Sequence, residues 1–161
     1  MSNFAPNNGF IIPQAIADTS TSQLLPLGTR VKAVDIAYGE GEFIYLKGVA
    51  STAIGSCVLI NQDDFSTSLL AANDIGDVAF AMSANVASSF GWYQIYGKAV
   101  GKVLAGFVDN ANCYGTATAG SIDDAIVAGD RIKKCKGASA IDAGLAELEI
   151  AYPFVDDGLA A

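Results

Sequence analysis

The chain has 161 residues, of which 52% are hydrophobic and only 16% are charged, and it carries a net charge of −8. This length fits one domain with a core that needs no disulfide or metal. The acidic balance argues against nucleic acid as a partner, because a polyanion is repelled. No run of 18 apolar residues occurs, so a membrane span is not expected. So few charges instead predict an outer surface that contacts other protein chains, with an ordinary monomer rich in Ala and Gly as the alternative.

Histidine is absent, which removes the triads of hydrolases, His-ligated zinc and the commonest general base. The three cysteines, Cys57, Cys113 and Cys135, include no CxxC pair, so a structural zinc site is not indicated. Reduced thiols are expected, with one disulfide and a leftover thiol as the alternative. We therefore expect no catalytic residues, no metal and no cofactor.

Residues 1–28 differ from the rest of the chain and predict an extended arm. They hold three of the four prolines, which disfavour a helix. A secretory signal is not expected here, because a basic segment followed by a continuous apolar stretch is absent from the first residues. Two alternatives stay open for the arm. It becomes ordered on contact with a neighbouring molecule, or it is an edge strand of the domain's own sheet.

From residue 29 to residue 161 the pattern predicts a single β-rich domain. Short alternating or β-branched runs are separated by turn signals every 8–14 residues, which is typical of a small barrel or sandwich of antiparallel strands. One or two short helices are expected as well, at 66–74 with Ser66 as N-cap and at 121–130 with Ser121 as N-cap. The predicted strands cover 29–35, 42–50, 56–61, 77–84 and 147–154.

The stretch SFGWYQIYGKAVGKVLAGF, residues 89–107, contains the only tryptophan of the chain. It is not a phosphate-binding loop, because the GK pair lacks the preceding glycine and the following Ser or Thr. Aromatic side chains on both faces indicate a strand buried on both sides, with bends at Gly97 and Gly101. Trp92 is accordingly predicted to pack in the core. A ligand platform and a subunit contact are the alternatives.

The charged residues offer little catalytic chemistry. The adjacent carboxylates, such as those at 123–124 and 156–157, are typical of turns and helix caps, and none follows the calcium-loop spacing. The one basic run is RIKKCK, residues 131–136. It is interpreted either as a contact with an acidic partner or as a solvated edge strand on which lysines block unwanted pairing.

Three segments together resemble the capsid decoration, or cement, proteins of tailed bacteriophages. GEGEFIYLKGVAST (39–52) resembles a hairpin of that family with the pattern G.GEF.YL.G. The strand pattern GW.Q..G.A is matched from Gly91 to Ala99, and DDAIVAGDRI (123–132) resembles the family's D..I.AGD.L turn. The match covers about half of the chain and consists of turn glycines and strand residues, whereas the first 28 residues match no such pattern.

The resemblance implies a structural, non-enzymatic protein on the outer capsid surface of a virion, made in the cytoplasm of a bacterial host. Its expected partners are the major capsid protein and copies of itself, a trimer in preference to a dimer, with no nucleic acid and no membrane. It would bridge neighbouring capsid subunits and stabilise the shell. The residues expected to contact the capsid or another subunit are Phe4, Phe10, Ile11, Ile12, Arg131, Lys133 and Lys134.

Two alternative functions stay open at this point. One is another virion part, such as a head-fibre base or a receptor-binding β-domain. The other is a carbohydrate-binding or glycan-hydrolysing domain, with Trp92 as the sugar platform and Glu40 or Glu42 as the acid.

Overall fold

The structure is a computed structural model that describes residues 4–6 and 12–156. Within these residues the protein is all-β, with antiparallel strands and no helix. No helix of this part of the chain is therefore long and apolar enough to cross a membrane. The strands are β1 Ala5–Pro6, β2 Thr19–Ser20, β3 Arg30–Asp35, β4 Gly39–Lys47, β5 Cys57–Ile60, β6 Thr67–Leu69, β7 Gly76–Ala81, β8 Phe90–Lys102, β9 Asn112–Gly115, β10 Ile122–Asp123, β11 Arg131–Gly137 and β12 Leu145–Val155.

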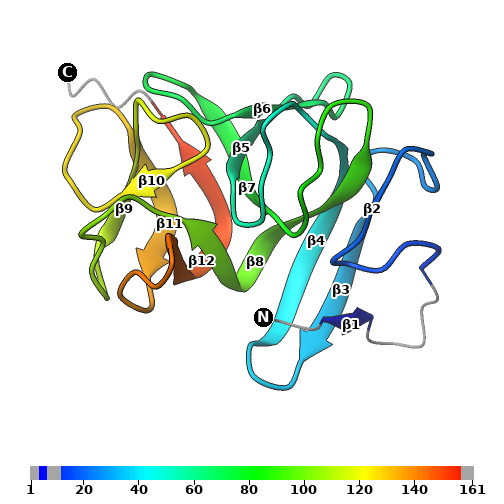
Figure 1. Ribbon diagram of the computed structural model, residues 1–161, viewed down its shortest axis with the longest axis horizontal. Coiled ribbons are helices and arrows are strands. Elements are labelled where there is room, and N and C mark those ends of the chain that lie inside the picture. The colour runs from blue at the N-terminus through cyan, green and yellow to red at the C-terminus, as the bar shows by residue number, and fades with distance from the viewer. Residues whose placement is uncertain (1–3, 7–11, 157–161) are drawn as a thin grey trace.

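All described strands belong to one continuous sheet with the order β1-β3-β4-β8-β7-β12-β11-β9-β10. In addition, β2 pairs with β8, and β5 pairs with both β6 and β7. Figure 1 shows the result: β1 to β4 occupy the right half of the molecule, β9 to β12 occupy the left half, and β8 runs between them. The strands predicted from the alternating pattern are confirmed in all five places.

The longest strand, β8, changes partners half-way along its length. Residues up to Tyr96 pair with β4 or β7, whereas the residues from Tyr96 to Lys102 pair with β12, so Tyr96 has a partner on each side. The change occurs at Gly97, which has a φ of 100° and would bring a Cβ atom within 2.6 Å of the Glu40 carbonyl oxygen. Gln94 holds the bend, because its amide donates hydrogen bonds to the carbonyls of Tyr96 and Lys98. The predicted bend at Gly97 is thus confirmed.

Buried side chains of the described residues form three clusters. The aromatic core cluster lies in the right half and contains Phe4, Ile16, Val31, Ala33, Phe43, Tyr45 and Trp92. The thiol core cluster lies in the left half and is aliphatic apart from Phe80 and Phe107, with all three cysteines inside it. Trp92 is fully buried against Tyr45, so its predicted core position is confirmed and its use as a surface platform is excluded.

The described part of the N-terminal segment packs onto the domain. Strand β1 pairs with β3, and β2 pairs with β8, as the edge-strand alternative predicted. Gln14 is almost fully buried and accepts a hydrogen bond from the Tyr45 hydroxyl, while its amide donates to the Phe90 carbonyl. The Trp92 indole N–H donates to the Gln14 carbonyl. We call the half with the aromatic core cluster the aromatic half and the half with the thiol core cluster the thiol half. Residues 12–20 are therefore part of the aromatic half.

The two predicted helices are wrong. Residues 67–69 form β6, which pairs with β5, and Ser66 donates to the Asp64 carboxylate instead of capping a helix. Residues 122–123 form β10, and the buried Ser121 presents its carbonyl to the Thr116 hydroxyl. Both segments are too short to form a helix by propensity alone, so pairing with a neighbouring strand decides their structure.

Candidate functional site

The four apolar residues predicted to make contacts from the arm have different positions. Phe4 is 8% exposed and packs edge-on against Phe43, so it serves the core and is not presented on the surface. Ile12 is half-buried against the same cluster. Phe10 and Ile11 lie outside the described residues. The described side chains of this group thus hold the arm to its own domain.

The basic run forms β11, which is not an edge strand, because it pairs with β12 on one side and with β9 on the other. Arg131, Lys133 and Lys134 are all exposed. The Arg131 guanidinium donates to the Asn112 side chain, and Lys133 forms an ion pair with Asp156. Lys134 stands at a bulge with a φ of 58°. The sheet therefore presents these cations from an interior strand.

The described residues provide no group of three or more side chains suited to hold a metal ion. All three cysteines are free and buried. Burial raises the pKa of the Cys57 thiol, and a hydrogen bond with the Cys113 thiol, together with burial, raises the pKa of Cys135. Because the thiolate is the nucleophile, both of these thiols are in the unreactive form at neutral pH.

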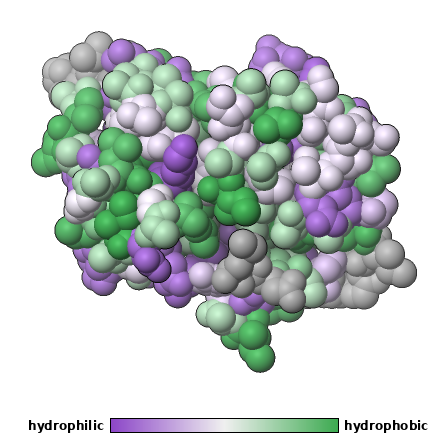
Figure 2. Space-filling view, in the orientation of Figure 1, coloured by the Kyte–Doolittle hydropathy of each residue, from purple (hydrophilic) through white to green (hydrophobic). Residues whose placement is uncertain are grey.

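Two loops carry isoleucines that are almost entirely in solvent. Ile36, at the tip of the β3–β4 hairpin, is 107% exposed. The tip is rigid, because the buried Asp35 carboxylate accepts hydrogen bonds from the backbone N–H groups of Ala37 and Tyr38, at 2.7 and 2.9 Å. In Figure 1 this hairpin ends at the bottom of the molecule, where Figure 2 shows hydrophobic atoms.

The second isoleucine, Ile126, is 83% exposed in the loop between β10 and β11. Both ends of this loop are tied down. The Asp124 carboxylate accepts a hydrogen bond from the Val108 N–H, and the buried Asp130 carboxylate accepts one from the Asn73 N–H at 2.7 Å. The loop lies at the left of Figure 1, well away from the β3–β4 hairpin. The molecule thus presents two separate, structured apolar tips.

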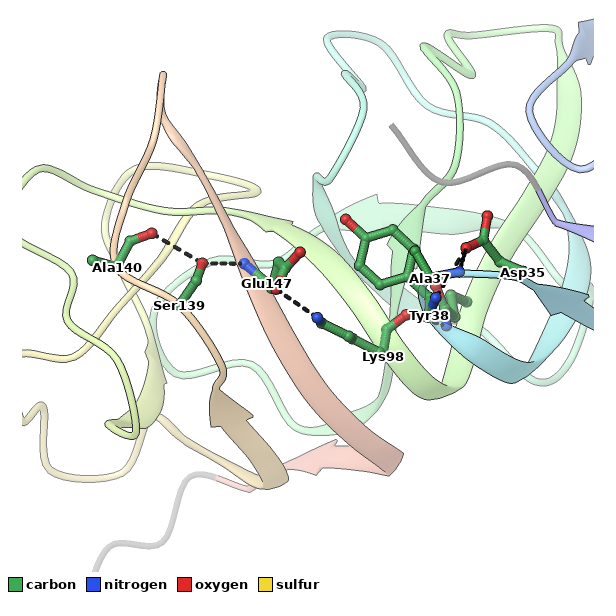
Figure 3. A network of polar contacts seen from close by, with 8 residues as sticks. Asp35, Ala37, Tyr38, Lys98, Ser139, Ala140 and Glu147 are labelled. Carbon is green, nitrogen blue, oxygen red and sulfur yellow. Dashed lines mark hydrogen bonds and ion pairs between the residues drawn. The ribbon is translucent and has the colours of Figure 1, made fainter.

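A groove of about 580 Å³ lies between the β3–β4 hairpin and the segment that leads into β12. Its wall is mostly apolar. The polar groups lie at one side, where side chains from the β3–β4 hairpin, β8 and β12 meet (Figure 3). The lining residues are Ala17, Tyr38, Ile54, Ala81, Met82, Val100, Ser139, Ala140, Asp142, Ala143, Leu145, Ala146 and Glu147.

The polar side of the groove is organised around Lys98. Its ammonium group lies 2.7 Å from the Glu147 carboxylate and 5.0 Å from the centre of the Tyr38 ring. The Lys98 hydrogen bond lowers the pKa of Glu147. Burial, and then the hydrogen bond to Glu147, raise the pKa of Tyr38. The Glu147 N–H also donates to the Ser139 hydroxyl, which ties this side of the groove to the loop before β12.

An exposed aromatic pair lies beside this network, on the same face of the sheet. The rings of Tyr96 and Tyr152 have centres 5.4 Å apart, and the two side chains are 43% and 47% exposed. The Tyr152 hydroxyl donates a hydrogen bond to the Glu42 carboxylate, and Arg30 lies 3.9 Å from the same carboxylate. The strand was predicted to be buried on both sides, so the exposure of Tyr96 corrects that prediction for this end of β8. Nothing in the sequence indicated its partner, which is 56 positions away and at a bulge.

Comparison of the chain with protein-family models, with curated proteins and with solved structures finds no match in any of the three.

Proposed function

We propose that this protein is a structural virion component that binds the outer surface of an assembled phage capsid, bridges neighbouring major capsid subunits and stabilises the shell. The observation that carries the proposal is the pair of exposed isoleucines, Ile36 and Ile126, on separate and internally hydrogen-bonded loops. An apolar side chain on a structured tip can enter a pocket of a partner with little further loss of conformational freedom. Two such tips allow one molecule to hold two neighbouring subunits.

The stabilisation would follow from mass action. A protein that binds only the assembled shell stabilises it by about 3–4 kcal/mol per site at a hundred- to thousandfold excess over Kd. Binding is favoured over catalysis because Cys57 and Cys135, the thiols with raised pKa, are buried and the chain has no histidine. The strongly bent sheet would act as a small barrel-like module, present as a trimer on the outer face of the virion after synthesis in the bacterial cytoplasm.

The exposed cations of β11 would add to this contact. Lys134 is the strongest candidate among them, because it is exposed at a bulge and forms no ion pair within the described residues, whereas Lys133 is paired with Asp156. Lys134 and the nearby Arg131 would face acidic groups of the capsid protein or of another copy, which would set the orientation of binding.

The test is a mixing experiment with tailed-phage heads from which the decoration protein has been stripped. We expect saturable binding, extra density across the shell faces in electron micrographs, and greater resistance of the decorated heads to heat. An Ile36→Asp/Ile126→Asp variant should lose at least about tenfold in affinity. Ile75→Asp is the matched control, because Ile75 is 57% exposed in a different loop.

Failure of the unaltered protein to bind stripped heads would overturn the proposal, as would undiminished binding by the double variant. Density confined to a vertex or a tail would instead assign the protein to a fibre base. Deletion of the whole arm is a poor test, because Gln14 and Ile16 belong to the aromatic half and their loss would unfold it.

A further inference from the structure

We propose that the outer face of β8 and β12 is a binding site for a neutral oligosaccharide, with the rings of Tyr96 and Tyr152 as its platform and the groove beside Tyr38 as its continuation. This inference does not depend on the role in the capsid. It uses Tyr38 of the β3–β4 hairpin but neither of the exposed isoleucines, Ile36 and Ile126.

The strand geometry makes the platform and the groove continuous. Tyr96, Lys98 and Val100 are exposed or half-exposed, whereas Ala99 and Gly101 are buried, so the three side chains share the outer face of β8 on either side of the bend at Gly97. On β12 their cross-strand partners are Ala151, Glu149 and Glu147. Val100 and Glu147 line the groove, and Lys98 bridges Glu147 and the Tyr38 ring. A linear ligand can therefore run from the aromatic pair into the groove along one strand.

The backbone of Tyr152 has an unfavourable conformation. This residue has a φ of 54°, in the left-handed region that a bulky side chain rarely adopts, and it stands directly before Pro153. It lies in the stretch where β12 leaves β8 and joins β7, opposite the bulge at Lys134. Strain that the surroundings maintain at an exposed aromatic residue indicates a functional position.

The polar groups on this face are mainly acceptors. The Glu42 and Glu147 carboxylates lie along it, Asp142 is a further lining residue of the groove, and a carboxylate only accepts hydrogen bonds. The cations Arg30 and Lys98 are already paired with two of these acids. Such a surface fits a ligand that brings many hydroxyl donors and a flat apolar face, as a hexose does. The tyrosine rings supply rigid apolar area for that face.

Other ligand classes fit less well. An extended peptide would need an open sheet edge, but the backbones of β8 and β12 are paired with each other along this face. An anionic glycan would be repelled by a chain with a net charge of −8 and by the acids on the surface. The ligand is therefore a neutral hexose polymer.

The test is a titration of the 15N-labelled full chain with maltohexaose, cellohexaose, laminarihexaose and a mannohexaose, each up to about 10 mM. We expect saturable shifts for at least one of them, confined to β8, β12 and the β3–β4 hairpin. Tyr152→Gly should weaken that binding at least about tenfold while the melting temperature stays the same or rises, because glycine accepts the positive φ. Tyr96→Ala should weaken it similarly.

Ile126→Ser is the matched control, because it removes an exposed apolar side chain from the loop between β10 and β11, outside the proposed site, and should leave the binding unchanged. Absence of shifts with all four sugars would overturn the proposal, as would shifts that Tyr152→Gly leaves intact. If the unaltered protein bound none of the four sugars and Tyr152→Gly lost affinity for capsids, the proposal would be wrong and the surface would be a protein contact. Loss of capsid binding by the isoleucine variants alone would not affect this inference.

Discussion

The two halves of the molecule are stabilised by different means. In the aromatic half, the large rings of Trp92 and Tyr45 carry polar atoms that must find partners, and Gln14 supplies them from a segment outside the main strands. In the thiol core cluster, the side chains are apolar or weakly polar and, apart from the contact between Cys113 and Cys135, depend on packing. The comparison indicates that the aromatic half depends on particular hydrogen-bonding residues, whereas the thiol half depends on volume and on remaining uncharged.

The largest expected effect comes from removing the centre of the aromatic half. Trp92→Ala should lower the free energy of unfolding by about 3–5 kcal/mol, because it opens a cavity and leaves the Gln14 carbonyl without its donor. Urea denaturation measures this change. Trp92→Phe keeps most of the ring and should cost clearly less. A loss below about 1 kcal/mol for Trp92→Ala would contradict the assignment of this side chain to the core.

The next effect tests the hydrogen bond between Gln14 and Tyr45. Gln14→Leu should cost about 1–3 kcal/mol, because the buried Tyr45 hydroxyl loses its acceptor. The double variant Gln14→Leu/Tyr45→Phe should recover part of that loss, since neither partner is then left unsatisfied. Equal stability of the single and double variants, measured in the same denaturant, would show that the hydroxyl is satisfied by other means.

Residues such as Gln14 also show where sequence reasoning reaches its limit. Alternation of apolar side chains predicted the main strands and the burial of Trp92, because that signal is local and repeats every two residues. One glutamine in a proline-rich segment gives no such signal, and its partners lie 31 and 76 positions away. Ser66 gave a misleading signal and led to the wrong prediction of a helix, since a serine before an apolar run fits both a helix cap and a turn.

In the candidate sites, too, local features could be predicted from the sequence and long-range contacts could not. The aromatic residues on both faces of 89–107 predicted burial on both sides, which fits Trp92 but not the exposed Tyr96. The pairing of Tyr96 with Tyr152 depends on a register change between β11 and β12. The exposed Ile36 is flanked by ordinary hairpin residues, and only the three-dimensional position of the tip distinguishes it from a core isoleucine. Long-range register and loop geometry are thus what the sequence alone could not supply.

The thiol half should respond to pH where the aromatic half does not. Cys57 and Cys135 have a raised pKa in the folded state, so above the unfolded value of about 8.5 the unfolded chain releases protons that the folded chain keeps. Stability is therefore complete below that pH and falls as pH rises, by about 1.4 kcal/mol per pH unit for each thiol.

Denaturation between pH 8 and 9, where tyrosines with a pKa of about 10 have hardly begun to titrate, measures this slope. The variant Cys57→Ala/Cys135→Ala should flatten it, whereas Gln14→Leu should lower stability at every pH and leave the slope unchanged. A slope in the double cysteine variant as steep as in the unaltered chain would assign the alkaline effect to other groups.

The smallest effect concerns the polar link between the halves, where Lys98 joins Glu147 of β12 to Tyr38 of the β3–β4 hairpin (Figure 3). Both charged side chains are about one-third exposed, at 35% and 33%, so Glu147→Gln should cost only about 0.2–1 kcal/mol. Because Lys98 lowers the pKa of Glu147 in the folded state, the contribution is present above about pH 4.3 and is lost as pH falls through the lowered value. Lys32→Gln, which breaks a more exposed pair at 3.8 Å, is the control and should have a smaller effect. If Glu147→Gln instead cost as much as Gln14→Leu, the two halves would be coupled through this ion pair and not only through the shared strand β8.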